Sequence, residues 1–401
     1  MVERIILYLL FFLFFYDMKI SEPFLTVRFF MGMIGGVLFV IEMLKNKVAI
    51  NKWYISIFMV FSLLLIWNYI TCSYNSSNEY QYMYELKFLI IIFFASFFLV
   101  RISRNSITTI SSLFDLIVLM ALGQCCIAIL ASVSESVQQF VMAHSNALEQ
   151  FLEREQGTRL IGIGSAVFFG VLPTSSLAIL CCIYQYFHSL RRNKTIYALG
   201  FFFISFITFL MARTSIFVML SAAFLYFKYS KEQGKMSNKT LLLLLPIILL
   251  LLFRFAGSFM SAEMYEWAFR SFSRDSENTT VREIYEWYAF THFDTNTLLI
   301  GDARMTDGEG YYMGIDAGYI RAVFNVGIIG LILYFYFQYF EVKTIYKVTK
   351  NKDLWYFALA YFIFYFFIML KGYSSISKEL LFLLVMIDYG HLKFNDIKLV
   401  K

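Results

Sequence analysis

Apolar residues dominate this chain in long runs that are separated by short polar segments. A bilayer-spanning helix needs about 20 mostly apolar residues and satisfies its own backbone hydrogen bonds. Marking the runs and their breaks predicts twelve transmembrane helices. They are expected at residues 4–16, 24–44, 53–72, 86–100, 113–133, 160–187, 196–211, 214–229, 240–256, 318–340, 354–370 and 376–390.

The composition agrees with this pattern. Of the 401 residues, 60% are hydrophobic, 20% aromatic and only 15% charged, which excludes an ordinary soluble domain and indicates an integral membrane protein. The first run, Ile5 to Tyr16, lacks a following small-residue cleavage site, so it is interpreted as a helix rather than a signal peptide. The five cysteines show no metal-ligand spacing and are expected to be small buried hydrophobes.

Lysine and arginine predict the orientation. With the N-terminus inside, Arg4 and the inner segments hold 20 of the 34 Lys and Arg residues. The positive-inside rule therefore places both termini in the cytoplasm. The net charge of +6 has no basic cluster with interleaved aromatics, so no nucleic-acid partner is expected.

The two cations are distributed unequally. The inner segments hold 15 lysines and 5 arginines, whereas the rest of the chain holds 4 lysines and 10 arginines. Arginine binds phosphate and carboxylate bidentately, which suggests anion binding on the outer side. Chance or local packing is the alternative explanation.

Two predicted extracytoplasmic loops are too long to be simple connectors, a smaller one at 134–159 and a larger one at 257–317. The larger holds 11 acidic residues and four arginines, a net charge of −7. Two YEW triplets lie in it, and Thr280 and Glu283 before the second have capping-box spacing, which predicts an amphipathic helix there. Trp287 in that triplet suits sugar binding, while short helices lying on the membrane surface are the alternative.

The segment IGDARMTDGEGYYMG follows, in which glycines alternate with acids. It lacks a strand-then-helix context for nucleotide binding. It is expected to be a flexible loop that carries the candidate acids Asp302, Asp307 and Glu309.

Five arginines are predicted at the outer ends of helices: Arg28, Arg159, Arg213, Arg254 and Arg321. Charges at such depth are costly and normally face a protein interior or a watery cavity. Taken alone, Arg28 and Arg254 fit snorkelling anchors, but five together predict a site for a polyanion, for which a lipid-linked diphosphate is the natural candidate. No metal motif accompanies them, so no metal or cofactor is expected.

Two stretches resemble known families. DAGYIRAVFNVGIIG, 316–330, resembles the closing motif of bacterial O-antigen ligases: Gly327 and Gly330 match, but Asp316 stands where the ligases have histidine. GTRLIGIGSAVFFG, with Arg159 eleven residues before Gly170, resembles the R-x10-G pattern of Wzy-type O-antigen polymerases. Arg304 to Gly314 is a looser version, and Arg213 in LMARTS is similar to an arginine that follows an apolar helix in both families. The missing histidine favours the polymerase.

This resemblance implies a GT-C-like, all-α polytopic membrane protein that forms a single transmembrane domain over 1–401. It implies a glycosyltransferase that joins undecaprenyl-diphosphate-linked oligosaccharide units, as donor and acceptor, on the outer face of a bacterial inner membrane. The product would be O-antigen (lipopolysaccharide) or capsule polysaccharide. Membrane lipid and a chain-length regulator protein are the partners that this reading allows. The alternatives are an O-antigen ligase and, from another class, a lipid-linked oligosaccharide flippase.

The implied reaction is inverting and metal-independent, with Asp316 as general base and Arg213 and Arg159 binding the departing diphosphate. Asp316 as the N-cap of the following helix is the alternative role. Supporting substrate-binding residues are expected at Arg321, Arg282, Arg304, Arg254, Arg28, Glu309, Asp307, His292 and Trp287.

Overall fold

The computed structural model describes residues 2–21, 25–145, 158–165, 170–189, 194–232, 262–269, 279–307, 310–372 and 376–393. Nearly all of the described segments are helices. The first set comprises α1 (Val2–Tyr16), α2 (Val27–Leu44), α3 (Lys52–Tyr74), α4 (Gln81–Ser103), α5 (Ile110–Val133), α6 (Glu135–Ala143), α8 (Val171–His188), α9 (Lys194–Met211) and α10 (Ile216–Glu232). The second set comprises α12 (Ala262–Phe269), α13 (Thr279–Phe290), α14 (Thr295–Leu299), α15 (Gly318–Thr349), α16 (Lys352–Ile368) and α17 (Lys378–Gly390).

Strands are short and occur in two antiparallel pairs. They are β1 (Lys19–Ser21) with β2 (Leu25–Thr26), and β3 (Thr306–Asp307) with β4 (Gly310–Tyr311). Two short 3-10 turns, η2 (Arg213–Ser215) and η5 (Tyr312–Gly314), complete the described elements.

The chain is an all-α membrane protein. Within the described residues, α2, α3, α4, α5, α9 and α15 are long and apolar enough to cross a bilayer. Apolar side chains also face outward: Met59 and Ile66 on α3 are 66% and 55% exposed, which suits contact with lipid rather than water. Twelve spans stay a prediction, since the other helices are shorter or less apolar and 240–256 lies outside the described residues.

One predicted helix begins later than expected. Residues 160–165 are not helical, and α8 starts only at Val171. Gly164 has φ +65°, and a Cβ there would collide with the carbonyl oxygen of Tyr16, to which Ser165 N donates. The prediction of a helix from 160 is wrong because this glycine-rich segment packs by its backbone against the end of α1.

Other boundaries match or extend the prediction. The break at Arg213 is confirmed, because α9 ends at Met211 and η2 separates it from α10. The amphipathic helix predicted near Thr280 is confirmed as α13. Two features were missed: α6 lies within the predicted loop at 134–159, and α15 continues through its lysines to Thr349.

Four of the five cysteines are buried as predicted. Cys126 is the exception, because it lies on an exposed face of α5.

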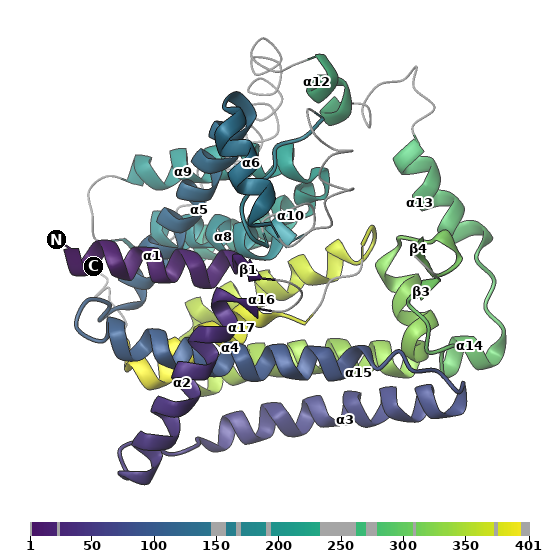
Figure 1. Ribbon diagram of the computed structural model, residues 1–401, viewed down its shortest axis with the longest axis horizontal. Helices are drawn as coiled ribbons and strands as arrows, with labels where there is room; N and C mark the ends of the chain where they lie inside the picture. The colour runs from purple at the N-terminus through teal and green to yellow at the C-terminus, as the bar shows by residue number, and fades with distance from the viewer. Residues whose placement is uncertain are drawn as a thin grey trace. The chain divides into compact units, whose positions relative to one another are not determined.

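Contacts divide the chain into two compact units: unit 1 is Met1–Val37, Phe94–Arg270 and Phe382–Lys401, and unit 2 is Leu38–Phe93 and Ser271–Leu381. The prediction of a single transmembrane domain stays a prediction. In unit 1, α8 is buried along almost its whole length and packs against α5, α9 and α10 (Figure 1). A helix that is apolar all round suits such a central position.

Unit 2 is built along α15, which packs against α3, α14 and α16 (Figure 1). The α15 helix is broken at Gly327, where φ is 64° and ψ is −176°. A Cβ at Gly327 would collide with Leu299 O, and one at Gly301 would approach the backbone of Val326 and Gly327. Gly330 likewise lacks room for a Cβ, because Val326 lies beside it. The two glycines that match the ligase motif, Gly327 and Gly330, therefore have a structural explanation.

Candidate functional site

Asp316 lies just before α15 in unit 2, and its carboxylate lies between two cations. Arg321 Nη1 is 3.5 Å from Asp316 Oδ1, and Lys371 Nζ is 3.7 Å from Oδ2. The three side chains are mostly buried. The N-cap of α15 is Ala317, with no side-chain cap bond, so the alternative role of Asp316 as N-cap is wrong. Its carboxylate instead forms ion pairs with Arg321 and Lys371.

Lys371 is brought to Asp316 by close packing of the α16 end against the start of α15. Tyr319 N donates to Met369 O at 3.1 Å, and the Tyr319 hydroxyl donates to Phe366 O at 2.7 Å. A Cβ at Gly318 would collide with Gly372 O. The backbones can approach this closely only because Gly318 has no side chain, and that approach places Lys371 beside Asp316.

Aromatic rings cover both cations. The Arg321 guanidinium lies 4.1 Å from the Tyr311 ring centroid, and Lys371 Nζ lies 4.3 Å from that of Trp287. Trp287 also packs on the buried cluster formed by Ile315, Ala317, Ile320 and Phe324. The site therefore joins one acid, two cations and two rings within unit 2.

Tyrosines at the site remain protonated. Burial and the nearby Asp316 carboxylate raise the pKa of Tyr311, while Arg321 partly opposes this effect. Burial raises the pKa of Tyr288 to about 12, and its hydroxyl donates to Leu370 O at 3.2 Å. Tyr288 thereby ties α13 to the segment that carries Lys371.

The loop before the site is held by polar groups from the end of α3. Asn75 Nδ2 donates to Gly301 O at 2.8 Å, and Ser77 Oγ donates to Ala303 O at 2.7 Å. Glu79 Oε2 accepts from Met305 N at 2.7 Å. These bonds fix a segment for which the sequence suggested a flexible loop, and the structure gives it the β3–β4 hairpin.

The other predicted residues of unit 2 lie at its surface. Arg282 makes an exposed pair with Glu286 at 2.6 Å, and Arg304 lies 5.6 Å from the Tyr312 ring centroid. Asp307 and His292 are exposed. Asp302 accepts a bond from Thr297 Oγ1 at 2.6 Å, which gives it a structural role, and nothing brings these residues into the Asp316 cluster.

Arg159 and Arg213 lie at the same end of unit 1. Leu160 N donates to Leu210 O at 3.2 Å, which joins the residue after Arg159 to the end of α9. Arg213 begins η2 just beyond it, and both arginines are half-buried. The prediction of a helix end is confirmed for Arg213, whereas for Arg159 it is wrong, because residues 158–165 are not helical and α8 begins only at Val171. The binding role of both arginines stays a prediction.

Arg28, also in unit 1, is held by the chain itself. Its Nε and Nη2 donate to Phe14 O and Phe15 O at 2.8 and 3.0 Å, and its Nη1 lies 3.7 Å from Asp17 Oδ2. It thus satisfies carbonyl groups at the end of α1, so its position at the start of α2 has a structural explanation. Arg254 and Glu309 lie outside the described residues.

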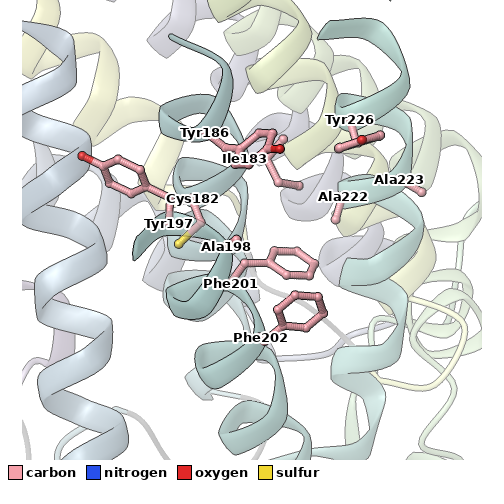
Figure 2. Close-up of a pocket in the computed structure, with 10 residues that line it drawn as sticks. All are labelled: Cys182, Ile183, Tyr186, Tyr197, Ala198, Phe201, Phe202, Ala222, Ala223 and Tyr226. Atoms are coloured by element: carbon pink, nitrogen blue, oxygen red, sulfur yellow. The ribbon is translucent and has the colours of Figure 1, made fainter. Parts of the chain in front are cut away.

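Unit 1 also contains an apolar cavity of about 70 Å³ between α8, α9 and α10 (Figure 2). It is lined by Cys182, Ile183, Tyr186, Tyr197, Ala198, Phe201, Phe202, Ala222, Ala223 and Tyr226. The Tyr197 hydroxyl points away from it (Figure 2) and donates to Asp115 on α5 at 2.6 Å. The lining offers hydrocarbon and aromatic surface only, so the cavity suits an apolar chain rather than a reacting group.

Sequence reasoning missed Lys371 and Tyr311. The signal for Lys371 was a lysine followed by glycine directly after an apolar run, on the side where lysines are rare.

Over the residues that the structure describes, no group of three or more His, Cys, Asp or Glu side chains is placed to hold a metal ion. Comparison with protein-family models, curated proteins and solved structures finds no match to this chain.

Proposed function

We propose that this chain is a membrane glycosyltransferase that polymerises oligosaccharide units carried on a lipid diphosphate, as its resemblance to Wzy-type polymerases implies. The observation that carries the proposal is the cluster in which Asp316 lies between Arg321 and Lys371 under two aromatic rings. Such a cluster combines a possible general base with cations for a departing diphosphate and ring faces for a sugar.

The ion pairs suggest how the base becomes active. A carboxylate paired with two cations is stabilised in its charged form and is a weak base. When the substrate diphosphate binds Arg321 and Lys371, it replaces Asp316 as their anion. The Asp316 carboxylate then takes the proton from the acceptor hydroxyl.

The hydroxyl oxygen forms a bond to the anomeric carbon of the donor, and the bond from that carbon to the diphosphate oxygen breaks. The electron pair leaves with undecaprenyl diphosphate, whose charge the cations stabilise without a metal ion. Attack from the opposite face inverts the anomeric carbon.

The apolar cavity supports a lipid-linked substrate. Phe202 in its lining and Met211, two residues before Arg213, are nine residues apart on α9, a rise of about 14 Å. Donor and acceptor each carry a lipid diphosphate. The one that binds Arg213, rather than Arg321 and Lys371, has an apolar tail that extends along this helix. The predicted roles of Arg159 and Arg213 as diphosphate binders are part of the proposal and are tested by substitution.

The test uses purified protein in lipid nanodiscs with a lipid-linked repeat unit. The expected product is a ladder of longer glycans that forms in the presence of a chelator. Asp316→Asn and Arg213→Ala should each remove the ladder, while Arg104→Ala, at an exposed turn, should retain it. A ladder that persists in both site variants would reject the site, and transfer only to an added lipid A core would indicate a ligase.

A second candidate, a lipid-linked oligosaccharide flippase, is favoured by one observation. Transporters place charged groups on broken helices, and α15 is broken at Gly327 and carries the buried Glu341. The sequence interpretation considered only charges at helix ends and overlooked this acid. Movement of the lipid-linked unit across proteoliposomes, without any ladder, would support the flippase over the polymerase.

A further inference from the structure

The interior of unit 2 contains more carboxylates than cations. Glu85 on α4 and Glu341 on α15 are 3% and 1% exposed. Glu379 and Lys378 extend from the first turn of α17. Three carboxyl groups therefore share one ammonium group among these helices.

This ammonium group, that of Lys378, pairs with Glu85. Lys378 Nζ lies 3.9 Å from Glu85 Oε2 and 4.3 Å from the Phe88 ring centroid, both on α4. Gln81 Nε2 adds a long hydrogen bond to Glu85 Oε1 at 3.5 Å. Glu85 thus has a cation beside it, whereas its Oε2 accepts no hydrogen bond.

Glu341 has no such partner. Within the described part of the chain, neither of its carboxylate oxygens has a hydrogen-bond donor. The Glu379 carboxylate lies close enough to interact with it electrostatically, and Glu379 Oε2 accepts from the Tyr365 hydroxyl at 3.3 Å. One turn before Glu341, the buried Gln338 amide makes no hydrogen bond of standard geometry.

Among the described residues, no cation other than Lys378 is paired with these acids. On α3, which packs along α15, Phe61 presents a ring to Phe337 at 5.3 Å. On α16, Tyr361 and Tyr365 interact with Glu379. On α15 itself, Tyr334 interacts with Tyr82 and Glu85 on α4, and Lys378 on α17 pairs with Glu85.

A buried carboxyl group that has no donor and lies within electrostatic reach of a second acid is costly to ionise without a cation. Over the described residues, no third acid, histidine or cysteine joins them in a metal-binding group. A proton needs only one carboxylate oxygen to bind. The arrangement therefore favours a proton on Glu341 over a metal ion.

We propose that Glu341 and Glu379 form a proton-binding site inside unit 2, in which Glu341 holds the proton at neutral pH. Glu379 is half-buried, so it and the Tyr365 hydroxyl are the route by which the proton exchanges. This site is separate from the Asp316 cluster and does not depend on glycosyl transfer.

Infrared spectroscopy of the full-length protein in nanodiscs tests the site. A protonated carboxylic acid gives a carbonyl band that is distinct from the carboxylate bands and shifts in heavy water. At pH 7, the difference between wild type and Glu341→Gln should show the loss of one protonated-acid band. Glu135→Gln, at an exposed position on α6, is the matched control and should show only the loss of a carboxylate.

Thermal unfolding provides a second measurement. Because glutamine resembles a protonated glutamic acid, Glu341→Gln should leave the melting temperature at pH 7 nearly unchanged, whereas Glu341→Lys should lower it. The proposal is overturned if Glu341→Gln removes a carboxylate band at pH 7. It is also overturned if added sodium ions displace the protonated-acid band of the wild type.

Discussion

The Arg28–Asp17 pair of unit 1 and the Arg321–Asp316 pair of unit 2 are alike in position. Each joins an arginine in the first turn of a helix to an aspartate that precedes that helix, at 3.7 and 3.5 Å. Their other contacts differ. Arg28 also donates to two backbone carbonyls, and Asp17 Oδ1 accepts from Arg28 N at 3.0 Å.

The Arg321–Asp316 pair instead contacts side chains of unit 2. Asp316 is shared with Lys371, and Arg321 lies against the Tyr311 ring. A pair tied to backbone groups can be broken only by disturbing the fold, whereas a pair tied to side chains can exchange its partners when a ligand arrives. The comparison teaches that the anchoring of an ion pair, more than its length, separates a structural arginine from a candidate binding arginine.

Two arginine substitutions test whether Arg28 and Arg321 differ in role, and they have the largest expected effects. Arg321→Ala should reduce polymerisation by about 100-fold, the order expected for losing a group that stabilises developing charge. Arg28→Ala should leave Asp17 buried without its cation and lower the free energy of unfolding by about 3 kcal/mol. Activity per folded molecule should then stay near wild type for Arg28→Ala.

The measurements are product ladders normalised to folded protein, and unfolding monitored by tryptophan fluorescence in detergent. The comparison fails if both variants lose stability alike while retaining activity, since Arg321 would then be structural too.

A glycine substitution sharpens the comparison by testing the backbone that supports the site in unit 2. Gly327→Ala places a Cβ at φ 64° and ψ −176°, facing Leu299 O. Strain of this kind costs about 1–3 kcal/mol, so the melting temperature should fall. In Gly310→Ala the added Cβ meets only Asp307 O at 3.8 Å, so that variant should melt like wild type. Equal melting temperatures for the two variants would show that the break in α15 can relax.

The sequence allowed the helices and the single residues to be predicted better than their partners. Apolar runs located most helices, and the polar Arg213 located the turn between α9 and α10, because both features are local. The partners of Asp316 required tertiary contact: Arg321 lies one turn away and was anticipated, but Lys371 is 55 residues away and reaches the site through the Gly318–Gly372 approach. Glu341 was overlooked because it directly follows an apolar run and precedes a series of lysines, so the sequence placed it in a polar segment after the helix rather than inside the protein.

A third aspartate extends the comparison from the arginines to the acids, and its substitution has the smallest expected effect. Asp294 caps α14, where its Oδ1 accepts from Thr297 N at 2.7 Å. That backbone hydrogen bond lowers the pKa of Asp294 below its ordinary value. Because the folded-state pKa is the lower one, the capping stabilisation is fully present above the unfolded-state pKa and is lost as pH falls through the folded-state pKa. Like Asp17, this acid is held by backbone N–H.

Asp294→Ala should therefore melt at a lower temperature than wild type at pH 7, and this gap should narrow in strongly acidic buffer, where the wild-type carboxylate is protonated. Thermal unfolding from pH 7 down to about pH 2, well below the ordinary aspartate pKa, measures the gap. Asp307→Ala, at an exposed strand position, is the matched control and should show no such pH-dependent gap. If the difference in melting temperature between Asp294→Ala and wild type stays constant over this range, the cap acts through shape rather than charge. Asp294 could then no longer be grouped with Asp17.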